Sequence, residues 1–275
     1  MRAFARATRL ELVRLIGWRR WAVAAAVLTV VGWVLAEELN GSARDRGFRV
    51  NLWDVPLEAL NNVVIVAIIV VPLFVGLVGD VLLGDRRTNF AALSLHRIRS
   101  RSRWWAAKLT AVSSAAFLYF GLIVAVMSAV GAVALPTGTA LSDYGAATPD
   151  PFASAASALK SYGPPPFPTL ALVGIGAEAA YAAAATAALT MVVLTITLLW
   201  PRPWTPVVTI LAISLVFLRV DPTNVLHPLI HLFWDYHGLA ARSVAVTWSA
   251  SAIYLSVEVW LALMVGCAIL RRCDL

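Results

Sequence analysis

Charged residues are scarce in this 275-residue chain, since Asp, Glu, Lys and Arg together make up only 13% of it. A soluble domain usually carries about twice that fraction. Hydrophobic residues reach 60% and the mean hydropathy is +0.80, so the composition excludes an ordinary soluble protein and predicts an integral membrane protein. The chain has only two cysteines, Cys267 and Cys273, which excludes a disulfide framework. We expect Cys267 near a membrane edge and Cys273 in the cytosol.

Sequence motifs for nucleotide hydrolysis and for common membrane-bound chemistry are also missing. There is no Gly-x-x-x-x-Gly-Lys-Ser/Thr phosphate loop, and no cytoplasmic segment is long enough for a nucleotide-binding fold. A His-Glu-x-x-His zinc motif and a serine nucleophile elbow are absent as well. We therefore expect no ATP hydrolysis, no catalysis and no cofactor in this chain. The net charge of +7 does not indicate nucleic acid, because the charges cluster by membrane side.

Long apolar runs are what the chain does have. About 20 apolar residues are needed to cross a bilayer as a helix, and the alternating pattern of a membrane barrel is absent. The sequence predicts an all-α, polytopic protein forming one transmembrane domain over residues 1–275. The six predicted spans are Trp21–Ala36, Leu60–Gly79, Trp105–Leu135, Thr169–Leu199, Thr205–Leu218 and Thr247–Leu270.

Basic residues divide unevenly between the two sides of these spans. Six of the 22 Lys and Arg residues lie on one side: Arg44, Arg46, Arg49, Lys160, Arg219 and Arg242. The other sixteen lie in the N-terminal segment, the 80–108 loop, the turn at Arg202 and the C-terminus. The positive-inside rule places both termini in the cytoplasm. An even number of spans independently requires the two termini to lie on the same side of the membrane. We expect a multi-pass protein of the cytoplasmic membrane.

The N-terminal segment 1–20 has basic and apolar sides when drawn as a helix. Arg2, Arg6 and Arg9 share one side, and Phe4, Leu12 and Leu15 share another. This pattern predicts an interfacial helix that leads into the first span. A basic tail without structure is the alternative. A cleaved signal peptide is less well supported, because the leader is longer than usual.

Two segments outside the membrane complete the predicted topology. Residues 136–168 are rich in Pro, Gly, Ala and Ser and should form an irregular extracytoplasmic loop, and residues 37–59 form another outside segment. The fifth span is short, and the apolar residues that follow Arg219 and Asp221 are interrupted by His and Pro. We expect an extracytoplasmic re-entrant segment within 219–246.

Ionisable residues inside or next to the membrane are candidate functional groups. Glu178 and Glu258 fall within the fourth and sixth spans, where they would line a substrate path or support packing as protonated acids. His227, His231 and Asp235 are spaced four residues apart, as metal ligands on one helical face would be. Polar groups lining the wet side of a re-entrant helix would show the same spacing, so no metal site is assigned.

The 80–108 loop combines a basic rim with an apolar helical face, which a loop serving only topology does not need. Along the loop Asp85 and Thr88 are followed by the apolar residues Leu93 and Leu95, the pair Ser100 and Arg101, and Lys108. This order resembles the cytoplasmic coupling region of ABC transporter permeases of the type-2 exporter family. In that family an acidic residue is followed by Thr, an apolar patch, a Ser/Arg pair and a Lys that opens the third span. The usual Gly after the acidic residue and the Pro before the Ser/Arg pair are absent here. The residues assigned to coupling are Asp85, Thr88, Phe90, Leu93, Leu95, Arg97, Arg99, Ser100, Arg101 and Lys108.

The resemblance implies the permease subunit of an ATP-driven exporter. It implies a separate ATPase chain that binds ATP and Mg²⁺, a second permease copy, identical or different, and contact with membrane lipids. A hydrophobic or amphipathic cargo such as a drug, antibiotic, peptide or lipid would suit its apolar surfaces. A membrane-embedded enzyme and a stand-alone immunity or scaffold protein remain alternatives. The basic rim would contact either the ATPase or anionic lipid.

Overall fold

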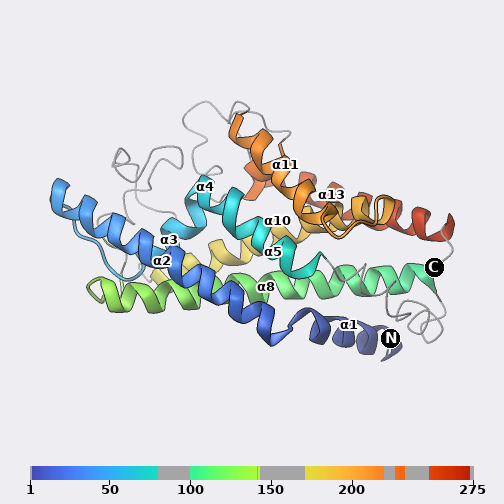
Figure 1. Cartoon of the computed structure of the whole chain (residues 1–275), viewed down its shortest axis with the longest axis horizontal. Coiled ribbons are helices and arrows are strands. Elements are labelled where there is room, and N and C mark those ends of the chain that lie inside the picture. Colours follow the sequence, from blue (N-terminus) through green and yellow to red (C-terminus); the bar gives the residue numbers. More distant parts are fainter. Residues whose placement is uncertain are drawn as a thin grey trace.

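A computed structural model describes residues 2–79, 100–140, 142, 171–219, 227–232 and 248–272. Within these ranges the chain is helical and contains no strand. Figure 1 shows the start of α1, the start of α8 and the end of α13 at one end of the molecule. Both termini therefore lie at the same end, which we call the terminal end.

The first two helices follow the predicted N-terminal organisation. α1 spans Arg2–Leu15, so the expected N-terminal helix is confirmed as a helix, and it packs along α8. α2 spans Trp18–Arg46 and ends at Gly47, which adopts a left-handed conformation (φ 74°) and donates its N–H to the Ala43 carbonyl. The helix thus runs well beyond the predicted end at Ala36, because the charged residues that follow do not interrupt it.

The second predicted span is bent. α3 (Asp54–Asn61) is followed by α4 (Val63–Ile65), the π-helical turn η1 (Val66–Val70) and α5 (Val71–Val78), and the two halves differ in direction by 63°. Asn62 stands at the bend, where its Oδ1 accepts the Ile65 N–H and begins the second half. The π-turn precedes Pro72, which has no N–H and crowds the preceding turn. The predicted outside segment 37–59 is largely helical, because α2 continues to Arg46 and α3 begins at Asp54. Most residues of α3 are also buried.

Four further elements complete the described fold. α8 spans Arg101–Ala134, α10 spans Ala171–Leu199, α11 spans Thr205–Arg219 and α13 spans Trp248–Arg272. η2 is a short 3₁₀ helix at Pro228–Leu232 that packs against α10, α11 and α13. α8 is central, since it contacts α1, α2, α3, α10 and α13.

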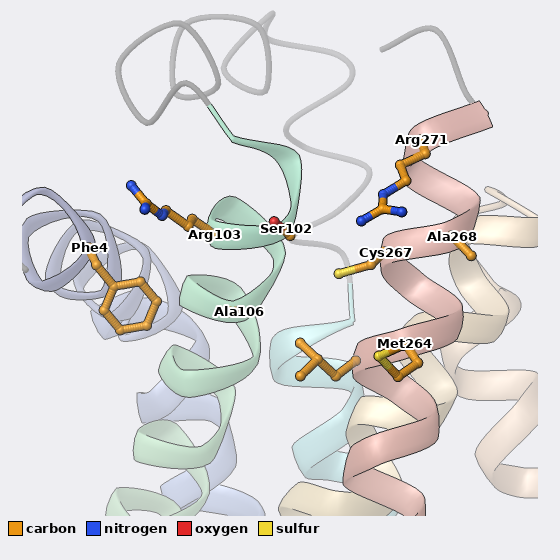
Figure 2. Close-up of a pocket in the computed structure, with 9 residues that line it drawn as sticks. Phe4, Ser102, Arg103, Ala106, Met264, Cys267, Ala268 and Arg271 are labelled. Carbon is orange, nitrogen blue, oxygen red and sulfur yellow. The ribbon is translucent and has the colours of Figure 1, made fainter.

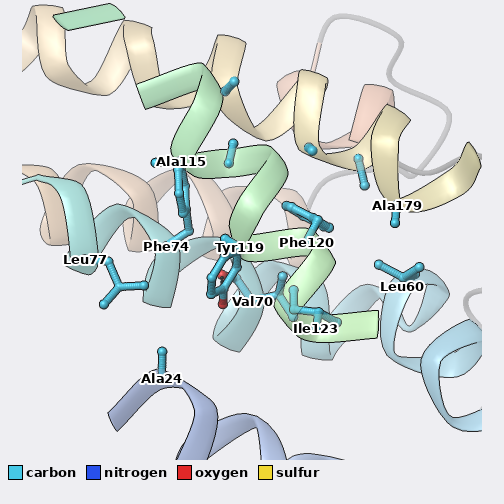
Figure 3. Packing of buried hydrophobic residues seen from close by; sticks show 14 of the residues in the cluster. Ala24, Leu60, Val70, Phe74, Leu77, Ala115, Tyr119, Phe120, Ile123 and Ala179 are labelled. Atoms are coloured by element: carbon cyan, nitrogen blue, oxygen red, sulfur yellow. Dashed lines mark hydrogen bonds between the residues drawn. The ribbon is translucent and has the colours of Figure 1, made fainter. Parts of the chain in front are cut away.

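Aromatic packing around Tyr119 joins the bent span to α8 (Figure 3). The Tyr119 ring lies 5.3 Å from that of Phe74 and 5.7 Å from that of Phe120, measured between centroids. Its hydroxyl donates to the Val70 carbonyl at 3.0 Å, beside the π-turn. The polar end of this fully buried ring is therefore satisfied, while the ring supplies apolar contact.

The helices establish a multi-pass membrane protein. α2, α8, α10 and α13 are each long and apolar enough to cross a membrane, and the bent pair gives a fifth span if its halves are counted together. α11 has only 15 residues, so it falls short of a full crossing by length. The predicted conformations of the 80–99 part of the loop and of 143–168 concern residues outside those the structure describes.

Candidate functional site

Glu178 and Glu258 are both buried, one on α10 and the other on α13. These two helices pack against each other and against η2. Buried or partly buried polar side chains lie on all three elements, and we call them the polar cluster: Glu178, Tyr181, His231, Ser251, Tyr254 and Glu258.

His231 is the centre of this cluster. It lies on η2 with 2% of its surface exposed, and its Nδ1 is 2.7 Å from the Ser251 Oγ. Its ring stacks on Tyr254, with centroids 4.1 Å apart and planes inclined by 24°. The Tyr181 ring of α10 meets the Trp248 ring at the start of α13 edge to face, with centroids 5.2 Å apart. The 3₁₀ helix is thus held against α13 by a hydrogen bond and a ring stack, both from His231.

Glu258 lies one helical turn beyond Tyr254 on α13. Only 9% of its surface is exposed, and its Oε2 has no hydrogen-bond partner among the described residues. Placing a carboxylate in apolar surroundings is costly unless a cation, a proton or a donor compensates it. Glu258 is therefore suited to taking a proton or a positively charged group. Glu178 lies one turn from Tyr181 on α10.

His227 and His231 do not share the helical face that the spacing of the metal candidates suggested. Residues 228–232 form a 3₁₀ helix, in which positions four apart point in different directions. His227 lies before it, and its Nδ1 accepts the Leu229 N–H at 3.2 Å. Asp235 lies outside the described residues, among which no group of three potential ligands is assembled.

A second group of predicted residues lies at the terminal end, where α8 begins. Ser100 caps α8, since its Oγ accepts the Arg103 N–H at 3.3 Å. Arg101 donates from Nη1 to the Leu270 carbonyl at 2.6 Å, which places a guanidinium on the unpaired carbonyls that end α13. Arg101 therefore ties the start of α8 to the end of α13.

Lys108 is buried rather than exposed. Its side chain is 2% exposed, and its Nζ lies 2.9 Å from the Glu11 Oε2 on α1 and 4.8 Å from the centre of the Trp104 ring. A side chain so enclosed does not touch a partner protein. We therefore correct its expected role from a coupling contact to a residue that positions α8 against α1. The remaining coupling candidates lie in the undescribed segment: Asp85, Thr88, Phe90, Leu93, Leu95, Arg97 and Arg99.

Between the terminal end and the polar cluster, α8 and α10 are both hydrogen-bonded to α13. The Trp105 Nε1 donates to the Ala262 carbonyl at 3.0 Å, and the Thr195 hydroxyl of α10 donates to the same oxygen at 3.3 Å. Ala262 is one turn from Glu258. Gly266 permits this approach, because a Cβ there would collide with the Trp105 indole. α8, α10 and α13 thus meet at one carbonyl.

Ser251, Tyr254, Trp105 and Glu11 are not among the functional residues predicted from the sequence, whereas Glu258 is. Ser251, Tyr254 and Glu258 recur at intervals of three and four on the last span, which is the signal of a polar face on an apolar helix. Trp105 and Glu11 carry no comparable signal, since their partners are distant in sequence. Comparison with known proteins finds no matching family model, no similar curated protein and no similar solved structure.

Proposed function

We propose that this chain is the membrane-spanning permease subunit of an ATP-driven exporter of the cytoplasmic membrane. A separate ATPase chain binds ATP and Mg²⁺, and a second permease copy completes the transport path. The chain itself holds no cofactor and performs no catalysis. In this proposal the 80–108 loop and both termini are cytoplasmic, and the loop seats in the ATPase.

One observation carries the proposal: the helix that leaves the loop is hydrogen-bonded to α13, the helix that carries Glu258 of the polar cluster. Arg101 bonds to the end of α13, Trp105 bonds to the Ala262 carbonyl, and Glu258 lies one turn further along the same helix. Motion imposed on the start of α8 would therefore shift α13 at the depth of Glu258. Such a connection suits a protein that alternates between two packed states.

The arrangement of the ends supports the proposed topology. Both termini and the start of α8 lie at the same end of the molecule (Figure 1), where most of the basic residues also gather. Six crossings are obtained when the bent α3–α5 pair and the short α11 are each counted as one. In this topology η2 is a re-entrant segment, and its buried Leu229, Ile230 and Leu232 are covered by α10, α11 and α13.

The polar cluster supports an amphipathic cargo. Glu258 and the Tyr254 ring offer a negative charge beside an aromatic face, a combination that attracts organic cations. The surrounding apolar helices would accept the hydrophobic part of the same molecule. Glu178, on the opposing helix, extends the polar surface of the path.

The decisive experiment measures whether a cytosolic ATPase depends on the loop. Affinity-tagged protein is purified from its native membranes, and ATP hydrolysis per permease is measured for wild type and for R97E/R99E. We expect ATPase activity with the wild type and a loss of most of it in the variant. R202E is the matched control, because Arg202 is an exposed arginine in another predicted cytoplasmic turn.

Two results would contradict the proposal. If R97E/R99E recovers the same ATPase activity as R202E, the loop does not hold the motor. If wild-type protein from native membranes carries no ATPase activity at all, a stand-alone immunity or scaffold protein is favoured instead.

A membrane-embedded enzyme is the second candidate, and the contact between Ser251 and His231 favours it. A serine hydroxyl 2.7 Å from an imidazole nitrogen has the spacing of a nucleophile and its base. Ser251 is fully buried, however, so the pair would have to open before a substrate could reach it. A fluorophosphonate probe should label wild type but not S251A if the pair is catalytic. S256A, which removes an exposed hydroxyl from the same helix, should still be labelled.

A further inference from the structure

A pocket of about 430 Å³ lies between α1, α8 and α13 at the terminal end, apart from the polar cluster. Figure 2 shows its walls, with the start of α8 in the middle and α1 and α13 on either side. The side chains that matter for its chemistry are Phe4, Arg103, Ala106, Met264, Cys267 and Arg271.

The upper level of the pocket is positively charged. The guanidinium groups of Arg103 and Arg271 lie on either side of Ser102 in Figure 2. Both side chains are exposed, and in the described part of the chain no carboxylate lies within ion-pair distance of either one. Arg101, by contrast, is occupied with the carbonyls at the end of α13. Two positive charges thus flank the opening, and neither has a carboxylate partner among the described residues.

The lower level is apolar. Phe4 of α1 and Met264 of α13 lie below the two arginines in Figure 2, and Ala106 and Leu263 continue the same lining. Leu10 and Val13 on α1, and Ile16 directly after it, are exposed apolar side chains, as expected where a helix touches lipid. The change from charge to apolar lining occurs over the depth of this one pocket.

We propose that this pocket binds one anionic phospholipid. The lipid phosphate lies between Arg103 and Arg271, and the first part of an acyl chain lies against Phe4, Ala106 and Met264. A guanidinium pair recognises a phosphate by charge and hydrogen bonding, while the apolar level distinguishes an amphiphile from a free anion. The inference needs only a membrane-embedded chain, so it stands independently of the exporter proposal.

Cys267 provides a reporter within the pocket. It is partly buried, and C273S leaves it as the only thiol in the chain. Full-length C273S protein in detergent is reacted with a maleimide while phosphatidylglycerol or phosphatidylcholine is added in increasing amounts. We expect phosphatidylglycerol to slow the labelling of Cys267 in a saturable manner and phosphatidylcholine to have little effect.

Arginine variants identify the charges responsible. R103Q/R271Q should need about thirtyfold more phosphatidylglycerol for half-protection, from about 1 kcal/mol per basic residue near an anionic lipid. R202Q/R272Q is the matched control, because it removes two exposed arginines that do not line the pocket and should keep wild-type protection. R103K/R271K retains both charges, so its half-protection concentration of phosphatidylglycerol should rise much less than that of the glutamine variant.

Four outcomes would overturn the inference. The first is protection of Cys267 by phosphatidylcholine equal to that by phosphatidylglycerol, and the second is unchanged protection in R103Q/R271Q. The third is equal protection by glycerol phosphate, and the fourth is protection that depends on the protein concentration and not on the lipid concentration. The third would indicate a site for free anions, and the fourth would indicate that a second copy of the chain covers the pocket. Native mass spectrometry of the R103K/R271K protein with phosphatidylglycerol provides an independent measurement should the glutamine variant fail to fold.

Discussion

At the scale of single residues, burial decides what a charged side chain does. Lys108 and Arg103 both lie in the first turns of α8, yet Lys108 is enclosed against Glu11 and Arg103 faces a pocket. Their sequence context is similarly basic, so no local pattern separates them. The partner of Lys108 is 97 positions away in the chain, and only the packing of α1 on α8 brings the two together.

Replacing Lys108 should destabilise the folded chain more than the loss of an exposed charge would. K108M leaves the Glu11 carboxylate buried, with Arg14 at 3.5 Å as its remaining partner. We expect the free energy of unfolding to fall by an amount near the lower end of about 3–5 kcal/mol, the usual cost of removing one partner of a buried ion pair. The measurement is the midpoint of thermal denaturation in detergent.

Two further variants test the cause. E11M/K108M removes both charges and should recover most of the lost stability, since apolar side chains then fill the site. R6M removes an exposed charge from α1 and should leave the midpoint nearly unchanged. A double variant as unstable as K108M would show that the pair does not act as a unit.

At the scale of helices, close approach depends on small residues that apolar composition alone does not reveal. The buried side of α13 is a narrow stripe that includes Ala262 and Gly266, where the helix meets Trp105 and Thr195 of its neighbours. Its other faces carry large exposed apolar side chains such as Trp260 and Met264. The contact between α8 and α13 therefore rests on a few positions.

Gly266 is the position at which this contact can be tested. G266A places a Cβ against the Trp105 indole, which is buried and held by its bond to Ala262. We expect a loss of about 1–3 kcal/mol, as for other over-packed interiors, measured by the same denaturation midpoint. G121A is the control, because nothing lies within 4 Å of a Cβ built at Gly121. Equal midpoints for the two variants would contradict the close approach.

At the scale of the whole molecule, the number of membrane crossings depends on whether the bent α3–α5 pair and the short α11 each cross the membrane. Length alone qualifies four helices, with the bent α3–α5 pair as a fifth and α11 as a shorter apolar helix. Hydropathy marks the difference between the halves, since Asp54–Asn61 contains Asp54 and Glu58 whereas Val63–Val78 is apolar, but it does not register the 63° bend itself. The bend lies at Asn62, between the two halves, and the π-turn before Pro72 lies within the second half.

The proposed topology makes a direct labelling prediction. In a C267S/C273S background, single cysteines at Asn224 and Arg242 should react with a membrane-impermeant maleimide on intact cells. Cysteines at Arg97 and Arg272 should react only after the membrane is opened. If position 224 or 242 does not react on intact cells, the predicted re-entrant segment is wrong. If position 97 reacts on intact cells, the predicted cytoplasmic coupling loop is wrong.

The sequence by itself determined the class of this protein, because composition and the length of apolar runs are properties of the chain that need no partner. It also located the buried Glu178 and Glu258, since an acidic residue stands out in an apolar span. Only the tertiary structure decided that His231 packs on Ser251 and Tyr254 and that the Lys108 side chain is buried against Glu11. The same holds for Arg101, which donates a hydrogen bond to a carbonyl at the end of α13. Each of those results joins distant segments, and the energy of such contacts depends on packing that no local pattern encodes.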